Sequence, residues 1–366
     1  MKISQLLAVL KQQNVRLAVD GERLLCYFPD DDYKLPTQLA GAIRDNKAEL
    51  LTFFQSLKPG ATKLSPVKPA THSANSYPLS SQQENLWFAD QFEQGLDYSY
   101  NNAGTIHFDG KLDAAIIQQC FNDVIKRHQS LRTRFFAEQG KPRQAVNQQF
   151  IIEMPLIEIN DESEVDALVV AHAQHLFDLA SGQLLKITLL KLSEVKHILA
   201  FNIHHIVSDG WSIRVLFQEL KVLYSGYLNK VPPLKLPTLD LQYADYASWQ
   251  HQLKQQGGFE THLNYWEKQL KGAPQLLELA TDYVRAPVQD HQGAAINFVL
   301  PDGLKQQLNS LSIANGATLF MTLLAGFNIL LWRYTQQDDL LVGSPIANRG
   351  QKSLEDLIGF FVNTLV

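Results

Sequence analysis

A proline-rich stretch at residues 58–78 limits what this chain can fold into, because it divides the chain into two parts. The segment KPGATKLSPVKPATHSANSYP holds four prolines and shows no apolar periodicity, a composition typical of linkers. A second proline-rich segment, KVPPLKLPTLD at 230–240, separates two later parts. A chain of 366 residues is long enough for two or three domains. We therefore expect a domain at 1–57, a linker at 58–77, and two lobes at 78–235 and 236–366.

The composition is that of a folded protein. Hydrophobic residues make up 45% and charged residues 19%, which excludes a disordered chain, a collagen and a long coiled coil. The net charge of −5, with no long basic run, argues against binding to nucleic acid. The apolar tract Leu319–Trp332 is interrupted by Thr322 and Asn328, so it is too short to span a membrane. Cys26 and Cys120 are too few for a disulfide framework or a metal cage. We expect a cytoplasmic protein without membrane contact.

Residues 1–57 predict a small domain with the order helix, hairpin, helix, helix. Leu6, Leu7 and Leu10 share one face of the first helix. The run VRLAV, followed by Asp20-Gly21 and a second apolar run, is a strong hairpin signal. Two further apolar patterns, after Pro36 and after Asn46, predict the last two helices.

The second strand of this hairpin is apolar on both faces. One face carries Leu24, Cys26 and Phe28, and the other carries Leu25 and Tyr27. In a two-stranded sheet one face has little core to contact, and an open strand edge can bind an extended peptide. The alternative is that helices cover both faces of the hairpin.

The remainder of the chain mixes helical and strand patterns, which predicts an α/β or α+β fold. Helices are expected at 114–127, 212–228, 243–255, 261–270 and 319–334. Strands are expected at 131–136, 197–207 and 295–300. No internal repeat is present.

The segment HHIVSDGWS, residues 204–212, is the strongest candidate for chemistry. On a strand His204 and His205 point to opposite faces, so they do not bind one metal together, and we expect no metal site. An imidazole at the end of a strand can act as a general acid or base at neutral pH. Asp209 is suited to hold the turn by pairing with an arginine, and Gly210 to provide a positive φ or a close backbone approach. The alternative is that both histidines are hydrogen-bonded core residues and Asp209 caps the next helix.

Other chemistries lack their motifs. The sequence contains no G-x-S-x-G, no P-loop and no G-x-G-x-x-G. These absences argue against a serine hydrolase and against a nucleotide-binding or dinucleotide-binding site.

Together with its neighbours, the histidine motif resembles the condensation domain of nonribosomal peptide synthetases. Five stretches follow the family's order: SSQQENLW (80–87), RHQSLRTRF (127–135), IHHIVSDGWS (203–212), YADYASWQ (243–250) and IGFFVNTL (358–365). Gln82 and Asn85 depart from the alanine and arginine usual in the first motif. The form HHIVSDGWS is most similar to the subtype that joins two L-configured residues.

The resemblance implies two lobes, each like chloramphenicol acetyltransferase, with the active site at their junction. It implies formation of an amide bond between an upstream thioester and the amine of a downstream aminoacyl group. Both groups are carried on phosphopantetheine arms of partner carrier proteins, and no cofactor is bound in this chain. The motif residues carried over as catalytic are His205, with His204, Asp209 and Gly210. The residues carried over as supporting the site are Trp211, Arg132, Arg349 and Asn363, with Arg132 and Arg349 equal candidates to pair with Asp209.

Residues 1–56 resemble the TubC-type docking domain, in element order and in the stretches DGERLLCYFP and KAELL. That family binds the C-terminal tail of a preceding synthetase protein along the second hairpin strand. The resemblance therefore implies that Leu24, Leu25, Cys26, Tyr27 and Phe28 dock an upstream subunit. A homodimer of docking domains is a further implied arrangement.

The sequence departs from the condensation family at its end. It stops at Val366, inside the fifth motif, so the second lobe is expected to be incomplete and Leu319–Trp332 partly uncovered. Two alternatives to amide formation stay open. One is an epimerising or ester-forming member of the same superfamily, and the other is a subunit-recognition fragment without turnover.

Overall fold

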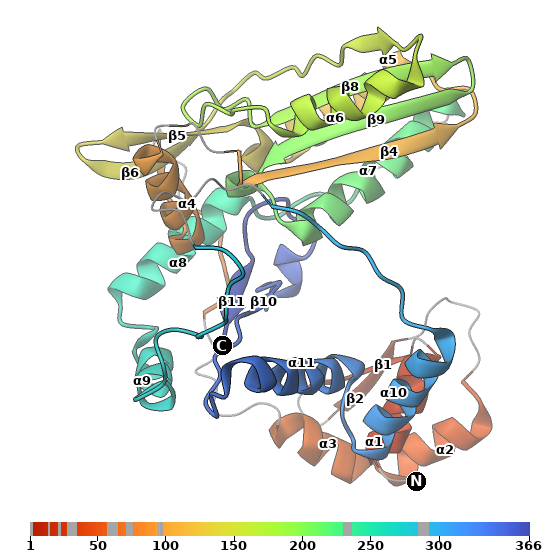
Figure 1. Cartoon of the computed structure of the whole chain (residues 1–366), viewed down its shortest axis with the longest axis vertical. Helices are drawn as coiled ribbons and strands as arrows, with labels where there is room; N and C mark the ends of the chain where they lie inside the picture. Colours follow the sequence, from red (N-terminus) through yellow and green to blue (C-terminus); the bar gives the residue numbers. More distant parts are fainter. Residues whose placement is uncertain are drawn as a thin grey trace. The chain divides into compact units, whose positions relative to one another are not determined.

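The computed structural model describes residues 3–13, 15–20, 23–27, 35–56, 65–70, 76–93, 95, 98–229, 236–284 and 293–366. Internal contacts divide the chain into two compact units. The first unit comprises Met1–Leu64 and Lys271–Leu341, and the second comprises Ser65–Leu270 and Val342–Val366. Helices and strands occur in both units (Figure 1), so the predicted mixed α/β class is confirmed.

The N-terminal part of the first unit has the predicted order of elements: α1 (Ile3–Gln12), β1 (Arg16–Asp20), β2 (Arg23–Tyr27), α2 (Thr37–Asp45) and α3 (Lys47–Ser56). Leu6, Leu10 and Leu50 are almost fully buried in its core. The strands β1 and β2 pair antiparallel, with Leu17 opposite Cys26. The side chains of Leu24 and Cys26 pack against this core. The side chains of Leu25 and Tyr27, and all of Phe28, lie outside the described residues.

The other part of the first unit contains α10 (Asp302–Ala314) and α11 (Leu319–Thr335). The strand expected at 295–300 is wrong: residues 293–300 form no strand, and Ile296 is 90% exposed. Alternating apolar residues form a strand only when a neighbouring strand accepts their backbone hydrogen bonds, and none of the described strands does so here.

Within the described residues no single helix is long and apolar enough to cross a membrane. One pair, Gly303–Ala314 with Leu319–Thr335, passes by length and composition but is bent by 103°.

The second unit is built around a four-stranded sheet with the order β4-β9-β8-β7. Its strands are β4 (Asn101–Asp109), β9 (Lys196–His204), β8 (Leu185–Ser193) and β7 (Leu156–Glu158). The pairs β4–β9 and β8–β9 are antiparallel, and β7–β8 is parallel. Alternate residues of β9 point to opposite faces of the sheet. Helices cover both of these faces.

One face of this sheet is covered by α5 (Ala114–Arg127) and α7 (Gly210–Leu228), which contact each other. Figure 1 shows α7 running along the sheet. The other face is covered by α6 (Val165–Ala173), against Leu190 and Ile198. Helix α5 forms where the sequence predicts it: Asp113 caps it by accepting the N–H of Ile116, and its predicted inward residues are buried.

The second unit also contains short strands, helices and 3-10 turns outside the four-stranded sheet. They are β3 (Tyr77–Pro78), α4 (Ser81–Phe92), η1 (Gln129–Arg132), β5 (Thr133–Glu138), β6 (Lys141–Val146), η2 (Glu162–Glu164), η3 (His205–Val207), α8 (Tyr243–Gln255), α9 (Glu260–Gln269), β10 (Ser344–Ile346), η4 (Lys352–Leu354) and β11 (Asn363–Leu365). The strands β3, β6 and β5 form a second sheet in that order, and β10 pairs with β11.

A buried histidine on α6 predicts a pH dependence of stability. His172 is 8% exposed, and burial, with the nearby charge of Lys186, lowers its pKa to about 4. In the unfolded chain a histidine has a pKa of about 6.5. The unfolded state therefore binds a proton first as the pH falls, and stability is lost between about pH 6.5 and pH 4.

Replacement of His172 by glutamine should remove this dependence. Between pH 7 and pH 5 the wild-type chain should lose about 2 kcal/mol more stability than H172Q. Urea unfolding of both proteins at the two pH values measures the difference. Equal losses would show that His172 is not buried in its neutral form.

Candidate active site

His205 lies just beyond the end of β9, where a short 3-10 turn begins. The sequence predicted one strand through residue 207, but β9 ends at His204 and η3 covers His205–Val207. The strand ends here for a local reason. The N–H of Ser208 donates to the carbonyl of His205 (3.1 Å), and the Ser208 carbonyl in turn accepts from the His205 ring, so the chain turns back on itself.

The His205 ring is held in one tautomer by this turn. Its Nδ1 lies 2.7 Å from the carbonyl oxygen of Ser208. A carbonyl oxygen only accepts hydrogen bonds, so Nδ1 carries a proton and, in the neutral ring, the lone pair is on Nε2. The ring is half-buried and packs edge-on against Phe360, with 4.8 Å between ring centroids. Nε2 is therefore suited to accept a proton from an amine.

His204 has a different environment. It is 3% exposed, and its Nδ1 accepts the N–H of Ile206 at 3.1 Å. Its ring lies 6.1 Å from that of Phe177. This histidine matches the alternative interpretation of a hydrogen-bonded core residue. Among the residues that the structure describes, no group of three or more His, Cys, Asp or Glu could hold a metal ion.

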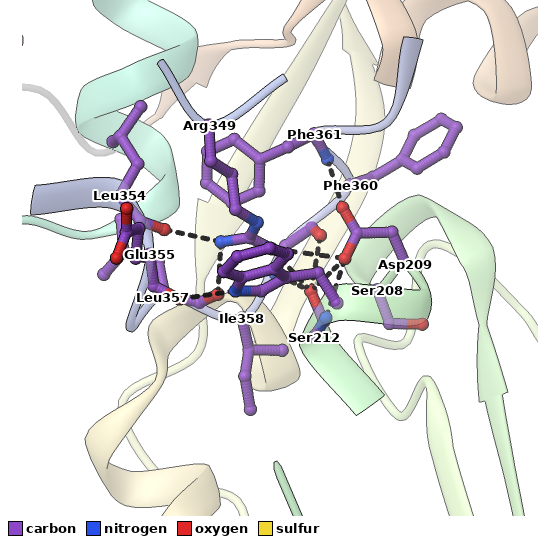
Figure 2. A network of polar contacts seen from close by, with 12 residues as sticks. Ser208, Asp209, Ser212, Arg349, Leu354, Glu355, Leu357, Ile358, Phe360 and Phe361 are labelled. Atoms are coloured by element: carbon purple, nitrogen blue, oxygen red, sulfur yellow. Dashed lines mark hydrogen bonds and ion pairs between the residues drawn. The ribbon is translucent and has the colours of Figure 1, made fainter. Parts of the chain in front are cut away.

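Asp209 joins three parts of the second unit (Figure 2). It caps α7, because its Oδ1 accepts the N–H of Ser212 at 2.8 Å. Its Oδ2 accepts the N–H of Phe361 at 3.0 Å, and Arg349 Nη2 lies 3.2 Å from Oδ1. The helix cap and the arginine partner were proposed as alternatives, and Asp209 serves as both.

Arg349 extends this network along the chain. Its Nη1 donates to the carbonyls of Leu354 and Leu357, and its Nη2 to the hydroxyl of Ser212 at 3.0 Å. The side chains of Arg349 and Asp209 are 2% and 3% exposed. Burial lowers the pKa of Arg349, and the charge of Asp209 opposes that shift. The guanidinium also lies 4.0 Å from the ring centroid of Phe361.

Arg132 was an equal candidate to pair with Asp209, and that interpretation is wrong. It is the last residue of η1, and its Nη1 donates to the carbonyl of Asn147 at 2.6 Å. Asn363 does not join the Asp209 network either. It begins β11 with an exposed side chain, whose oxygen accepts the N–H of Thr364. Trp211 does contact the network, because its indole N–H donates to the carbonyl of Glu355 at 2.7 Å.

Gly210 has neither of the backbone roles expected of it. It is the first residue of α7 and is not among the glycines with positive φ. A Cβ at this position would meet no atom within 4 Å. Its missing side chain instead leaves open space at the start of α7. Close approach occurs at Gly359, where a Cβ would overlap the ring of Tyr243.

His128 and Ser130 hold the segment around Ile358, although neither was among the predicted site residues. His128 Nδ1 accepts the N–H of Ile358 at 3.3 Å, and Ser130 Oγ donates to its carbonyl at 2.7 Å. His128 Nε2 then donates to Glu219 at 2.9 Å. Burial alone would raise the pKa of Glu219, but hydrogen bonds from His128 and Arg127 lower it. The only sequence signal was that His128 and Ser130 belong to the RHQSLRTRF stretch.

Comparison with known proteins identifies this arrangement. The Condensation domain family matches residues 73–366, and the TubC N-terminal docking domain family matches residues 3–56. The chain belongs to the condensation domain family. It is a condensation domain preceded by a docking domain, and the family is that of peptide-bond-forming, acyltransferase-like enzymes.

Curated relatives belong to peptide synthases. A protein of the linear gramicidin synthase of Brevibacillus parabrevis is 38% identical over 336 residues, which cover 90% of this chain and 6% of that protein. Chondramide synthase of Chondromyces crocatus is 40% identical over 314 residues, which cover 84% of this chain and 8% of that protein. This chain thus spans a small part of the length of these relatives.

Solved structures share the fold. The X-domain from teicoplanin biosynthesis is 25% identical with a TM-score of 0.73, covering 82% of this chain and 66% of that one. The cyclization-docking bidomain of a synthetase from Sorangium cellulosum is 22% identical with a TM-score of 0.68. The match covers 99% of this chain and 72% of that one. The match to condensation domains supports the predicted α/β fold class.

Proposed function

We propose that this domain forms an amide bond between two carrier-bound substrates. The amine of a downstream aminoacyl group attacks the thioester carbonyl of an upstream acyl group, and the upstream carrier thiol leaves. The observation that carries the proposal is the contact between the His205 ring and the Ser208 carbonyl. Its Nδ1–H is held by the Ser208 carbonyl at 2.7 Å, so Nε2 is left to accept the amine proton or to orient the amine for attack.

The other motif residues have supporting roles in this proposal. Asp209 and Arg349 tie the start of α7 to the segment that carries Phe360, the residue packed against the His205 ring. Trp211 adds a hydrogen bond to the same segment. His204 supports the turn rather than the chemistry, because its Nδ1 is engaged by Ile206. The predicted domain boundaries, the cytoplasmic location and the preference for two L-configured residues remain predictions.

The proposal is tested by a transfer assay with two loaded carrier proteins. One carrier bears an L-aminoacyl thioester and the other an L-aminoacyl acceptor, each on phosphopantetheine. The expected product is an amide-linked dipeptidyl thioester on the downstream carrier with both L configurations kept. An inverted centre would indicate epimerisation, and an ester product from a hydroxyacyl acceptor alone would indicate ester formation. No product from any pair would favour a recognition fragment without turnover.

We further propose that β2 binds the C-terminal tail of an upstream synthetase protein as an added strand. In the described part of the chain β2 pairs only with β1, so its other edge has backbone groups available. Leu24 and Cys26 pack on the core of the domain. Leu25 and Tyr27 alternate with these two residues in the sequence and are apolar, as the proposed contact with an added strand requires.

Replacement of Leu25 by aspartate should weaken binding of such a tail by tenfold or more, on the order of 1.4 kcal/mol, because a charge would replace apolar surface in the contact. Calorimetry of the full chain against synthetic C-terminal peptides of candidate upstream proteins measures this. Glu49→Ala, at an exposed position on α3, is the matched control and should bind as the wild type does. Equal affinity of L25D and E49A would place the binding surface elsewhere.

A further inference from the structure

The face of the second unit that carries α5 and α7 contains an apolar cavity of about 430 Å³. Side chains of β4, β9, α5 and α7 line it, and the residues around Asp209 and His205 do not contribute. Its floor is made of core residues, including Phe121 and Leu199, which are 0% and 2% exposed. Small-molecule sites in proteins have this character: a preformed apolar cavity of about 300–1,000 Å³ with few polar groups.

The cavity is elongated along α7. Phe217 and Leu228 both line it, and eleven residues of helix span about 16 Å. Phe217, Leu220, Tyr224 and Leu228 form one apolar stripe of the helix wall. This shape suits an unbranched chain better than a compact ring.

The mouth of the cavity has a single charge. Of its lining residues only Lys221 is charged, and no carboxylate within the described ranges forms an ion pair with it. Lys221 and Ser225 are one helical turn apart and both are exposed. An anion is favoured at Lys221 rather than at Asn229, because carbonyl groups at the C-terminal end of α7 repel negative charge.

We propose that this α5–α7 cavity binds an unbranched aliphatic carboxylate, with the chain along Phe217, Leu220 and Leu228 and the carboxylate at Lys221. The site goes beyond amide formation and does not depend on it. Calorimetry of the full chain with butanoate, hexanoate, octanoate and decanoate, all below their micelle concentrations, tests it. Affinity should rise by about threefold to fourfold per added methylene until the cavity is filled. Affinity that does not change with chain length would overturn the proposal.

Variants locate the binding. Ser225→Trp places a large ring at the exposed mouth and should reduce decanoate affinity at least tenfold. Gln218→Trp puts the same ring on an exposed position of α7 that does not line the cavity and should change nothing. The wild-type chain should bind decanoate more tightly than decanol by up to about fivefold, because an exposed charge contributes little. Lys221→Gln should remove this preference. If both tryptophan variants bind alike, decanoate binds elsewhere, for example on the exposed apolar side chains of α11, and the proposal fails.

Cys120 gives an independent readout, because it is free, 1% exposed and part of the cavity lining. Methyl methanethiolsulfonate is small enough to enter such a cavity, and mass spectrometry separates its reaction at Cys120 from that at Cys26. Decanoate should slow modification of Cys120 and leave Cys26 unaffected. Equal rates at Cys120 with and without decanoate would show that the cavity is not occupied.

Discussion

Replacement of Arg349 by alanine is expected to lower the free energy of unfolding of the second unit by about 3–5 kcal/mol. The guanidinium and the carboxylate of Asp209 are both almost fully buried. Removing one partner leaves the other charge in a low-dielectric interior without compensation. Arg349→Ala also removes one hydrogen bond to each of the carbonyls of Leu354 and Leu357. The midpoint of urea unfolding, followed by tryptophan fluorescence, measures the loss.

Arg214→Ala is the matched control for this experiment. Arg214 also lies near the ring of Trp211, at 4.1 Å, but it is exposed. Its loss should cost less than about 1 kcal/mol. Asp209→Asn separates charge from capping, since asparagine caps helices as well as aspartate does. This variant should lose the ion pair but keep the cap. A cost for R349A no larger than that for R214A would contradict the role of the buried pair.

The N-terminal domain and the helices α5, α7, α8 and α9 were predictable because local signals agree with tertiary packing there. The Asp20-Gly21 turn separates two apolar runs, and the structure pairs them as β1 and β2. In α5 the apolar period places Ile117, Cys120 and Phe121 inward, and all three are buried. Where a period and a cap point to the same element, sequence alone is sufficient.

The candidate site was predictable only in part, because its contacts join residues far apart in the chain. Arg132 follows Leu131 and Arg349 follows Asn348, and neither neighbour indicates which arginine pairs with Asp209. The choice depends on the segment Arg349–Phe361 returning to the start of α7, where Asp209 accepts from Arg349 and from Phe361. The same return brings Ile358 to His128, 230 residues away in the chain.

The missed turn at His205 has a different origin. The run HILAFNIHHIV is continuously apolar apart from its histidines and Asn202, so its periodicity contains no stop signal. The strand ends because Tyr100 supplies the last backbone partner of β9, its carbonyl accepting the N–H of His205, while the His205 ring turns to the carbonyl of Ser208. A side-chain contact to the backbone thus decides the position of the residue proposed to be catalytic.

Replacement of His205 by asparagine is expected to reduce amide formation between loaded carriers by about 10²–10⁴-fold. The asparagine amide can still donate to the Ser208 carbonyl, as Nδ1 does, so the turn is kept. The acceptor at Nε2 is removed, together with the ring contact to Phe360. Single-turnover transfer, measured by mass spectrometry of the downstream carrier, reports the loss. The urea midpoint should stay close to that of the wild type.

The pH dependence of H205N separates the two ways in which His205 could act. A free α-amino group has a pKa of about 7.7–8.0, so above that pH most of the acceptor amine is already deprotonated. If His205 mainly removes the proton, the deficit of H205N should shrink as the pH rises from 7 to 9. If it mainly orients the amine, the deficit should persist across that range.

Phe360→Leu should lower transfer less than H205N does, because it loosens the ring contact at 4.8 Å but leaves Nε2 in place. Wild-type rates for H205N at every pH would exclude His205 from the reaction.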